Sequence, residues 1–155
     1  MSPTMSRAEN VRVEREIEQE ERERNFETAV RLLATRLEIL DSEWSGFKFN
    51  VAKRARITLV TRERAVEAIK TYYLEVPYRA RKYLVLYKRV FIAGEHVPEI
   101  LTVVPFEWYY ERETFTWESA AREILCAILD YETCFGRFPI EIVDVQVEVL
   151  GVLEV

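Results

Sequence analysis

The sequence predicts an α+β domain, because helical and strand periodicities both occur in one chain of 155 residues. Apolar residues recur every three or four positions over 26–40 and again over 117–128, which is typical of the buried face of a helix. They alternate with polar residues over 143–149, which is typical of a half-buried strand. With 49% hydrophobic residues, a chain of this length can bury one real core but is short for two.

The first expected element is a long N-terminal helix with two unlike parts. Residues 7–24 consist largely of Glu and Arg, and oppositely charged residues four positions apart favour a solvated helix. Residues 26–40 carry the apolar stripe that packs against a core. We therefore expect a charged helical arm over residues 1–24 and a single α+β domain over residues 25–155. The arm either stays solvated or docks on a neighbouring subunit.

Charge is distributed unevenly along the chain. The segment Lys48–Arg89 contains twelve of the 22 basic residues but three of the 27 acids. Its net charge is therefore +9, while the rest of the chain carries −14. A basic segment with interleaved aromatic residues is the electrostatic footprint of a nucleic-acid contact. Five tyrosines are interleaved with these bases: Tyr72, Tyr73, Tyr78, Tyr83 and Tyr87.

Within this segment, residues 51–58 (VAKRARIT) resemble the second helix and turn of helix-turn-helix proteins. Such motifs often place a small residue beside a basic pair, followed by an aliphatic residue and a hydroxyl that starts the next helix. Thr61 is placed to cap a helix over 62–74. The resemblance implies a basic pair of helices, of which the second enters the major groove of DNA. Residues 55–60 also fit a short strand, because they are rich in aliphatic and β-branched residues.

A β-hairpin is expected next. Residues 82–93 and 99–110 are rich in aromatic and branched residues, and a loop over 94–98 separates them. Pro105 has no N–H to donate, so the second strand is expected at a sheet edge or bulged there. A hairpin directly after a helix-turn-helix takes the place of the wing, so the resemblance implies a winged-helix-like order of elements.

Two further elements complete the predicted fold. An amphipathic helix is expected to begin at Thr114 or Thr116 and to run to about Thr133. A C-terminal strand follows, in which the four valines from 143 to 149 share one face. Its apolar continuation to Val155 suits pairing within the sheet or completion of a neighbour's sheet.

These observations favour a protein that binds nucleic acid, DNA rather than RNA, through the 48–89 segment. Small proteins of this kind are often transcriptional regulators, which is an argument by analogy. Base reading, if any, is expected from the start of the 62–74 helix. The basic residues expected to contact nucleic acid are Lys53, Arg54, Arg56, Arg62, Arg64, Lys70, Arg79, Arg81 and Lys82.

Other functions stay open. One is a homo-oligomeric assembly protein, such as a viral coat or nucleoprotein subunit, whose segregated charges and arm make repeating contacts. Another is a metal-dependent nuclease in which Glu141, Asp144 and Glu148 hold a divalent cation. The bases can also simply pair with acids elsewhere in the chain. A single histidine, His96, and the lack of metal-ligand spacing of Cys and His favour a non-enzymatic protein without cofactor or metal.

Composition also predicts an environment. Glutamine occurs twice and asparagine three times, while Glu and Arg abound, which is typical of a thermophile, archaeal or viral. No signal-peptide-like or membrane-spanning apolar run is present, so we expect a cytoplasmic protein, in the host cell cytoplasm or a virion if it is viral, and no membrane partner. Cys126 and Cys134 lie too far apart to form a disulfide along one helix, and we expect two ordinary buried or half-buried thiols. A disulfide is the alternative, because intracellular proteins of hyperthermophiles can keep them.

Overall fold

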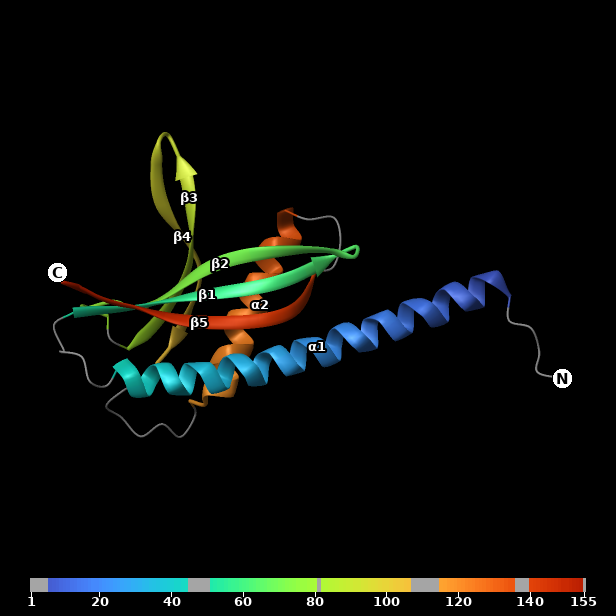
Figure 1. Ribbon diagram of the computed structural model, residues 1–155, viewed down its shortest axis with the longest axis horizontal. Helices are drawn as coiled ribbons and strands as arrows, with labels where there is room; N and C mark the ends of the chain where they lie inside the picture. Colours follow the sequence, from blue (N-terminus) through green and yellow to red (C-terminus); the bar gives the residue numbers. More distant parts are fainter. Residues whose placement is uncertain (1–5, 45–50, 81, 107–114, 136–139, 155) are drawn as a thin grey trace.

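The fold is a five-stranded antiparallel sheet with two helices packed against one of its faces, which confirms the α+β class. The computed structural model describes residues 6–44, 51–80, 82–106, 115–135 and 140–154 (Figure 1). The strand order is β4-β3-β2-β1-β5. In chain order the elements are α1 (Arg7–Trp44), β1 (Val51–Glu63), β2 (Val66–Val76), β3 (Tyr83–Ile92), β4 (Glu95–Pro105), α2 (Trp117–Phe135) and β5 (Glu141–Glu154).

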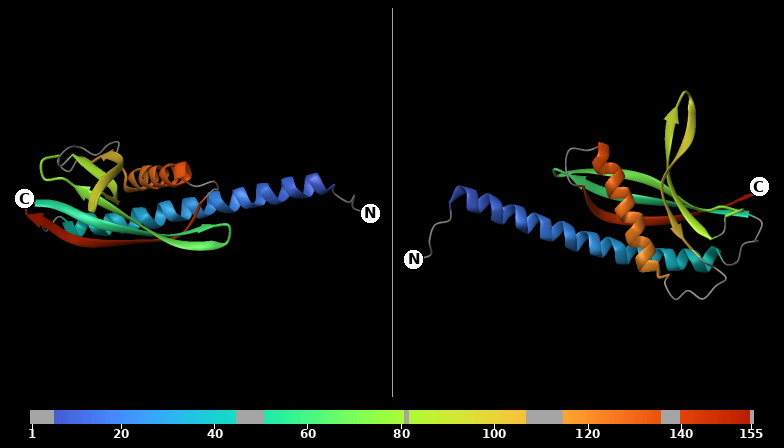
Figure 2. Two further views of the ribbon diagram at one scale, coloured as in Figure 1. Left: turned by 90° about the horizontal axis from the view of Figure 1, so that it is seen from above. Right: turned by 180° about the vertical axis from the view of Figure 1, so that it is seen from behind.

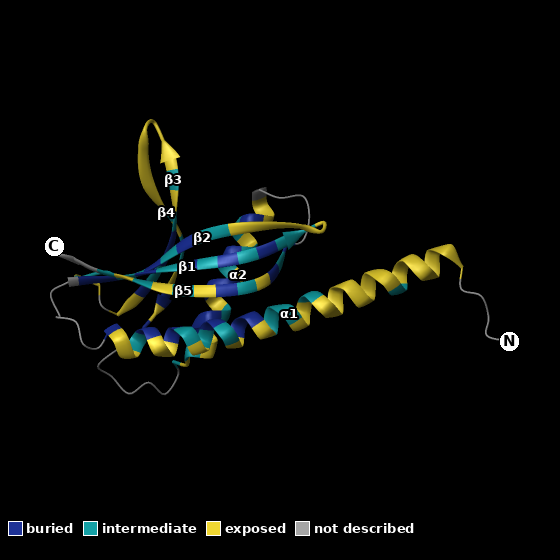
Figure 3. Ribbon diagram, in the orientation of Figure 1, coloured by how far each residue is buried: buried dark blue, intermediate teal, exposed yellow. Residues whose placement is uncertain are grey.

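Helix α1 is one continuous helix of 38 residues. The Ser6 hydroxyl accepts a hydrogen bond from the Glu9 N–H at 3.2 Å, and the Glu9 carboxylate accepts one from the Ser6 N–H at 3.4 Å. This reciprocal pair is a capping box, and it satisfies two backbone donors at the helix start. The first half of α1 projects beyond the sheet, and its buried positions begin at Ala29 (Figures 1 and 3). The boundary expected at residue 24 therefore falls inside an unbroken helix.

The core lies between the sheet and the two helices (Figures 2 and 3). Its α1 side is formed by the expected stripe, and its α2 side by the apolar face of that helix. Helix α2 begins after Thr116, whose hydroxyl accepts a hydrogen bond from the Ser119 N–H at 3.0 Å. The amphipathic helix and one of its two expected caps are thereby confirmed. Both Cys126 and Cys134 are free thiols, but they lie exposed on α2, so the expectation that they are buried or half-buried is wrong.

Residues 51–74 do not form the basic helical pair of a helix-turn-helix protein. They form β1 and most of β2, joined by a tight turn at Arg64 and Ala65, which adopt φ angles of 49° and 65°. Thr61, expected to cap a helix, is buried in β1, and its hydroxyl donates to the Ala68 carbonyl at 3.4 Å. The strand alternative for 55–60 is the one that is confirmed, because the inward-facing side chains there recur with a period of two. The turn lacks the Gly or Asn that usually marks a hairpin in a sequence.

The second hairpin is confirmed with a shorter turn than expected. Strands β3 and β4 pair from Tyr83↔Pro105 to Ile92↔Glu95, so the turn is the pair Ala93 and Gly94, with φ angles of 52° and 84°. Strand β4 is an edge of the sheet, as Pro105 indicated. In the described part of the chain, this hairpin follows α1 and the β1–β2 hairpin, so the helical pair expected before a wing is not formed there.

Strand β5 is confirmed and pairs with β1 inside the chain's own sheet. Its side-chain alternation is broken by an irregularity between the pairs Val60↔Asp144 and Thr61↔Ile142. Val143 is bulged out as a result and is 43% exposed, while Ile142 takes the core position. The expectation that all four valines share one face is therefore wrong at Val143. In the described part of the chain, no helix has the length and apolarity needed to cross a membrane.

Candidate nucleic-acid interface

One face of the sheet is covered by neither of the two helices that the structure describes, and this helix-free face presents alternate residues of the basic strands. Because directly paired residues of an antiparallel sheet share a face, the outward residues can be read from the register. Ala55, Ile57 and Leu59 of β1 are fully buried on the helix side. Their neighbours Arg54 and Arg56 therefore point to the helix-free side. The basic side chains of the 48–89 segment are therefore divided between the two faces of the sheet.

Three arginines on the helix-free face are neutralised by acids on neighbouring strands. Arg54 pairs with Glu75 at 3.3 Å, and Arg62 with Glu67 at 3.0 Å, both across the β1–β2 hairpin. Arg56 pairs with Glu148 of β5, its register partner. Glu75 and Glu67 are already counted in the net charge of the 48–89 segment, so only the pair with Glu148 cancels part of the charge segregation seen in the sequence. These three arginines were expected to contact phosphate, and each already has a counter-charge.

The remaining predicted contacts are scattered. Lys53 is buried, at 4% exposure, and Lys70 reaches to the helix side, where its Nζ lies 2.8 Å from Glu132 of α2. Arg81 lies outside the described residues. The other three lie exposed at the turns of the sheet, away from a shared site: Arg64, Arg79 and Lys82.

A stack of side chains crosses the helix-free face instead. The rings of Tyr73 and Tyr87 are stacked, with centroids 5.4 Å apart and planes inclined by 21°. The Arg89 guanidinium carbon lies 4.3 Å from the Tyr73 centroid, and that of Arg54 lies 6.0 Å from the Tyr87 centroid. Among the described residues, no carboxylate forms an ion pair with Arg89. Arg89 is thus an exposed cation held by an aromatic ring rather than by an acid.

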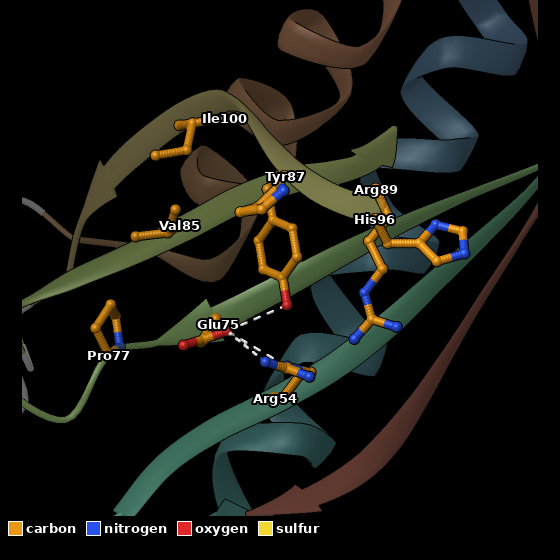
Figure 4. A pocket seen from close by; sticks show the side chains of 9 residues that line it. Arg54, Glu75, Pro77, Val85, Tyr87, Arg89, His96 and Ile100 are labelled. Atoms are coloured by element: carbon orange, nitrogen blue, oxygen red, sulfur yellow. Dashed lines mark hydrogen bonds and ion pairs between the residues drawn. The ribbon is translucent and has the colours of Figure 1, made fainter. Parts of the chain in front are cut away.

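Two hollows adjoin at this stack. The first, of about 360 Å³, is lined by Arg54, Glu75, Pro77, Val85, Tyr87, Arg89, His96, Pro98 and Ile100. Figure 4 shows the hydroxyl of Tyr87 and the guanidinium of Arg54 converging on Glu75, with Arg89 and His96 beside them. The second, of about 600 Å³, is lined by Ala68, Ile69, Lys70, Thr71, Tyr73, Lys88, Arg89 and His96. We call them the Pro77 hollow and the Lys70 hollow, and together the β2–β3 groove.

The two hollows differ in charge. The Pro77 hollow contains Glu75, which balances Arg54. The described lining of the Lys70 hollow contains three basic residues and no carboxylate. Burial, then the nearby charge of Glu75, raises the pKa of Tyr87 above its ordinary value, so this phenol stays protonated and donates to Glu75 at 3.1 Å. The positive end of the groove is therefore the Lys70 hollow.

The carboxylates expected for a nuclease do not converge. Glu148 accepts from Arg56, and Glu141 accepts from Asn25 of α1. Asp144 and Glu148 are four residues apart on one strand, which separates them by about 13 Å at roughly 3.3 Å per residue. In the described parts of the chain, no group of three or more His, Cys, Asp or Glu side chains is placed to hold a metal ion.

Sequence reasoning missed Arg89, Lys88 and the pairing of Tyr73 with Tyr87. The signal was present in β3, where Tyr87 and Arg89 alternate with Lys88, so that the first two share a face. It was read only as evidence for a strand. Comparisons with known proteins add no candidate, since no family model, curated protein or solved structure matches the chain.

Proposed function

We propose that the protein binds single-stranded nucleic acid in the β2–β3 groove. The observation that carries this proposal is the stack of Tyr87, Tyr73 and Arg89, which ends in an exposed guanidinium without an acidic partner among the described residues. A base can stack on the free side of an arginine guanidinium, and such stacking tolerates every base. The neighbouring basic side chains of the groove supply contacts to the phosphates.

A single strand is favoured over a duplex for two reasons. The described basic residues of the 48–89 segment lie on strands and turns rather than on a helix that fits a major groove. The groove also offers stacking surfaces, which only unpaired bases can use. Exposed Phe91 adds a further ring, 5.2 Å from that of His96 at the groove edge. DNA remains the expected ligand, and RNA of the same sequence is the comparison that tests this choice.

The test is fluorescence anisotropy with a labelled single strand and the matching duplex across a salt series. We expect the single strand to bind more tightly, with a log–log salt slope of about −2 from three cations at roughly 0.7 each. Arg89→Ala should weaken binding about tenfold, because stacking on a base contributes about 1–3 kcal/mol. Arg62→Ala is the matched control, since it removes the same charge from a residue already paired with Glu67.

Two outcomes contradict the proposal. One is the absence of binding to any oligonucleotide at low salt. The other is equal weakening by Arg89→Ala and Arg62→Ala, which would mean that binding follows net charge rather than the groove.

A second candidate function is self-assembly, and the projecting half of α1 favours it. This half carries charges of both signs, together with Val11 and Ile17, which are 40% and 50% exposed. A helix of this kind suits contact with another copy of the chain. Removing residues 1–24 tests this function, as set out in the Discussion.

A further inference from the structure

The Lys70 hollow opens where strands β2 and β3 diverge. These strands are paired at Tyr73↔Tyr87, Leu74↔Leu86 and Glu75↔Val85, and the tip of the β3–β4 hairpin stands away from the sheet (Figure 1). Residues of both faces line the hollow as a consequence. Its rim includes Arg89 from the helix-free face, and its helix side includes Lys70 and Lys88.

Lys70 and Lys88 share one carboxylate. The Nζ atoms lie 2.8 Å and 3.3 Å from the two oxygens of Glu132, a residue of α2 that is 7% exposed. The Tyr72 hydroxyl donates to the same carboxylate. Two ammonium groups thus face one counter-charge, which leaves one positive charge uncompensated at this contact.

One further carboxylate is packed near this contact, because Glu99 is the direct cross-strand partner of Lys88, but no ion pair joins these two described residues. Glu99 of β4 accepts a hydrogen bond from the Tyr131 hydroxyl at 2.9 Å, and it does not line the hollow. The Lys88 ammonium lies over the rings of Tyr72 and Tyr131, at 5.5 Å and 5.4 Å from their centroids. These contacts hold the ammonium in place without neutralising it. Together with Arg89, the hollow presents three cations, one from β2 and two from β3.

We propose that the Lys70 hollow binds a phosphate monoester, the terminal phosphate of the nucleic-acid strand. This inference rests on the proposed function for the identity of the strand, and on the hollow for the phosphate. A terminal phosphate carries up to two negative charges and several acceptor oxygens, which match two ammoniums and a guanidinium. A phosphate within a strand carries one charge, whereas a terminal phosphate carries up to two, which suits three cations of which two share one carboxylate.

The test compares one labelled single strand with a 5′-phosphate, a 3′-phosphate or no phosphate. We expect one terminal phosphate to tighten binding by about tenfold, the effect of one or two charge-assisted contacts. Lys70→Gln and Lys88→Gln should each remove this preference, while the unphosphorylated strand loses only the one phosphate contact of the missing lysine and still binds through Arg89. In each variant Glu132 keeps one lysine as an ion-pair partner, so the fold is expected to persist. Thermal unfolding of each variant checks this. Arg56→Gln, in a pair outside the groove, is the matched control.

Inorganic phosphate is the second probe, measured by thermal shift against chloride at equal ionic strength. If phosphate stabilises the wild type but not Lys88→Gln, and no strand binds, then the hollow is a phosphate site and the proposed function is wrong. If strands bind through Arg89 equally with and without a terminal phosphate, the phosphate inference is wrong and the proposed function stands. If phosphate does not stabilise the protein and no strand binds, both the phosphate inference and the proposed function are wrong.

Discussion

Tyr73 of β2 and Tyr87 of β3 are direct cross-strand partners, and their stacked rings lie at the point where the two hairpins of the sheet meet. The register joins β2 and β3 at three pairs, against eleven between β1 and β2. Cross-strand aromatic pairs stabilise a sheet beyond the area that they bury. This contact therefore joins the two halves of the sheet and also forms the wall of the groove.

Two substitutions at Tyr87 should separate the contribution of its ring to stability from that of its hydroxyl group. Tyr87 is 6% exposed, so Tyr87→Ala is expected to cost about 3 kcal/mol of unfolding free energy, as for other buried aromatic residues. Tyr87→Phe keeps the ring and removes only the hydrogen bond to Glu75, which should cost about 1 kcal/mol. Urea denaturation followed by circular dichroism measures both values. Equal losses in the two variants would show that the ring does not support the joint.

Neutralising Glu132 should destabilise the fold. Glu132→Gln leaves the ammoniums of Lys70 and Lys88 facing one another without their carboxylate. Loss of one partner of a buried ion pair lowers the free energy of unfolding by about 3–5 kcal/mol. We expect a loss of roughly 2 kcal/mol here, because both lysines keep some contact with water. Urea denaturation at pH 7 measures the loss. Glu67→Gln is the control, since its exposed pair with Arg62 should contribute little.

The same carboxylate predicts a pH dependence. Burial acts to raise the pKa of Glu132, but the hydrogen bonds from Lys70 and Tyr72 and the charge of Lys88 outweigh it, so the pKa is lowered. A lowered pKa gives a stabilisation that is present above the unfolded value of about 4.3 and is lost as the pH falls through the folded value. The difference in stability between wild type and Glu132→Gln should therefore be constant near neutrality and shrink in acid. A difference that grows in acid contradicts the assigned direction.

Removal of residues 1–24 should leave the domain folded. The buried positions of α1 begin at Ala29, and the contacts of Asn25 with Glu141 and of Glu27 with Arg122 are retained. The free energy of unfolding is expected to change by less than about 1 kcal/mol. Size-exclusion light scattering then tests assembly: a fall in oligomer mass with unchanged oligonucleotide binding identifies the arm as a connector. An unchanged mass removes the arm from any assembly function.

Much of the fold was readable from periodicity. The stripes of α1 and α2 each follow a helical period over twelve or more residues, the hairpin of β3 and β4 is rich in aromatic and branched residues, and β5 was predicted from the alternation over 143–149. The β1–β2 hairpin was missed because its turn, Arg64 and Ala65, carries no local turn signal. Val143 was misplaced because a bulge depends on the partner strand, which a sequence read along one strand does not contain.

The sequence by itself determined the class of fold, the order of most elements and the presence of a basic, tyrosine-rich segment, because these follow from local periodicity and composition. Only the tertiary structure decided which basic side chains keep a positive charge that no carboxylate neutralises. Arg54, Arg56 and Arg62 are neutralised by acids on other strands, whereas Lys70 and Lys88 share one carboxylate from α2. Charge pairing depends on distances between residues far apart in the chain, and strand register and helix packing set those distances.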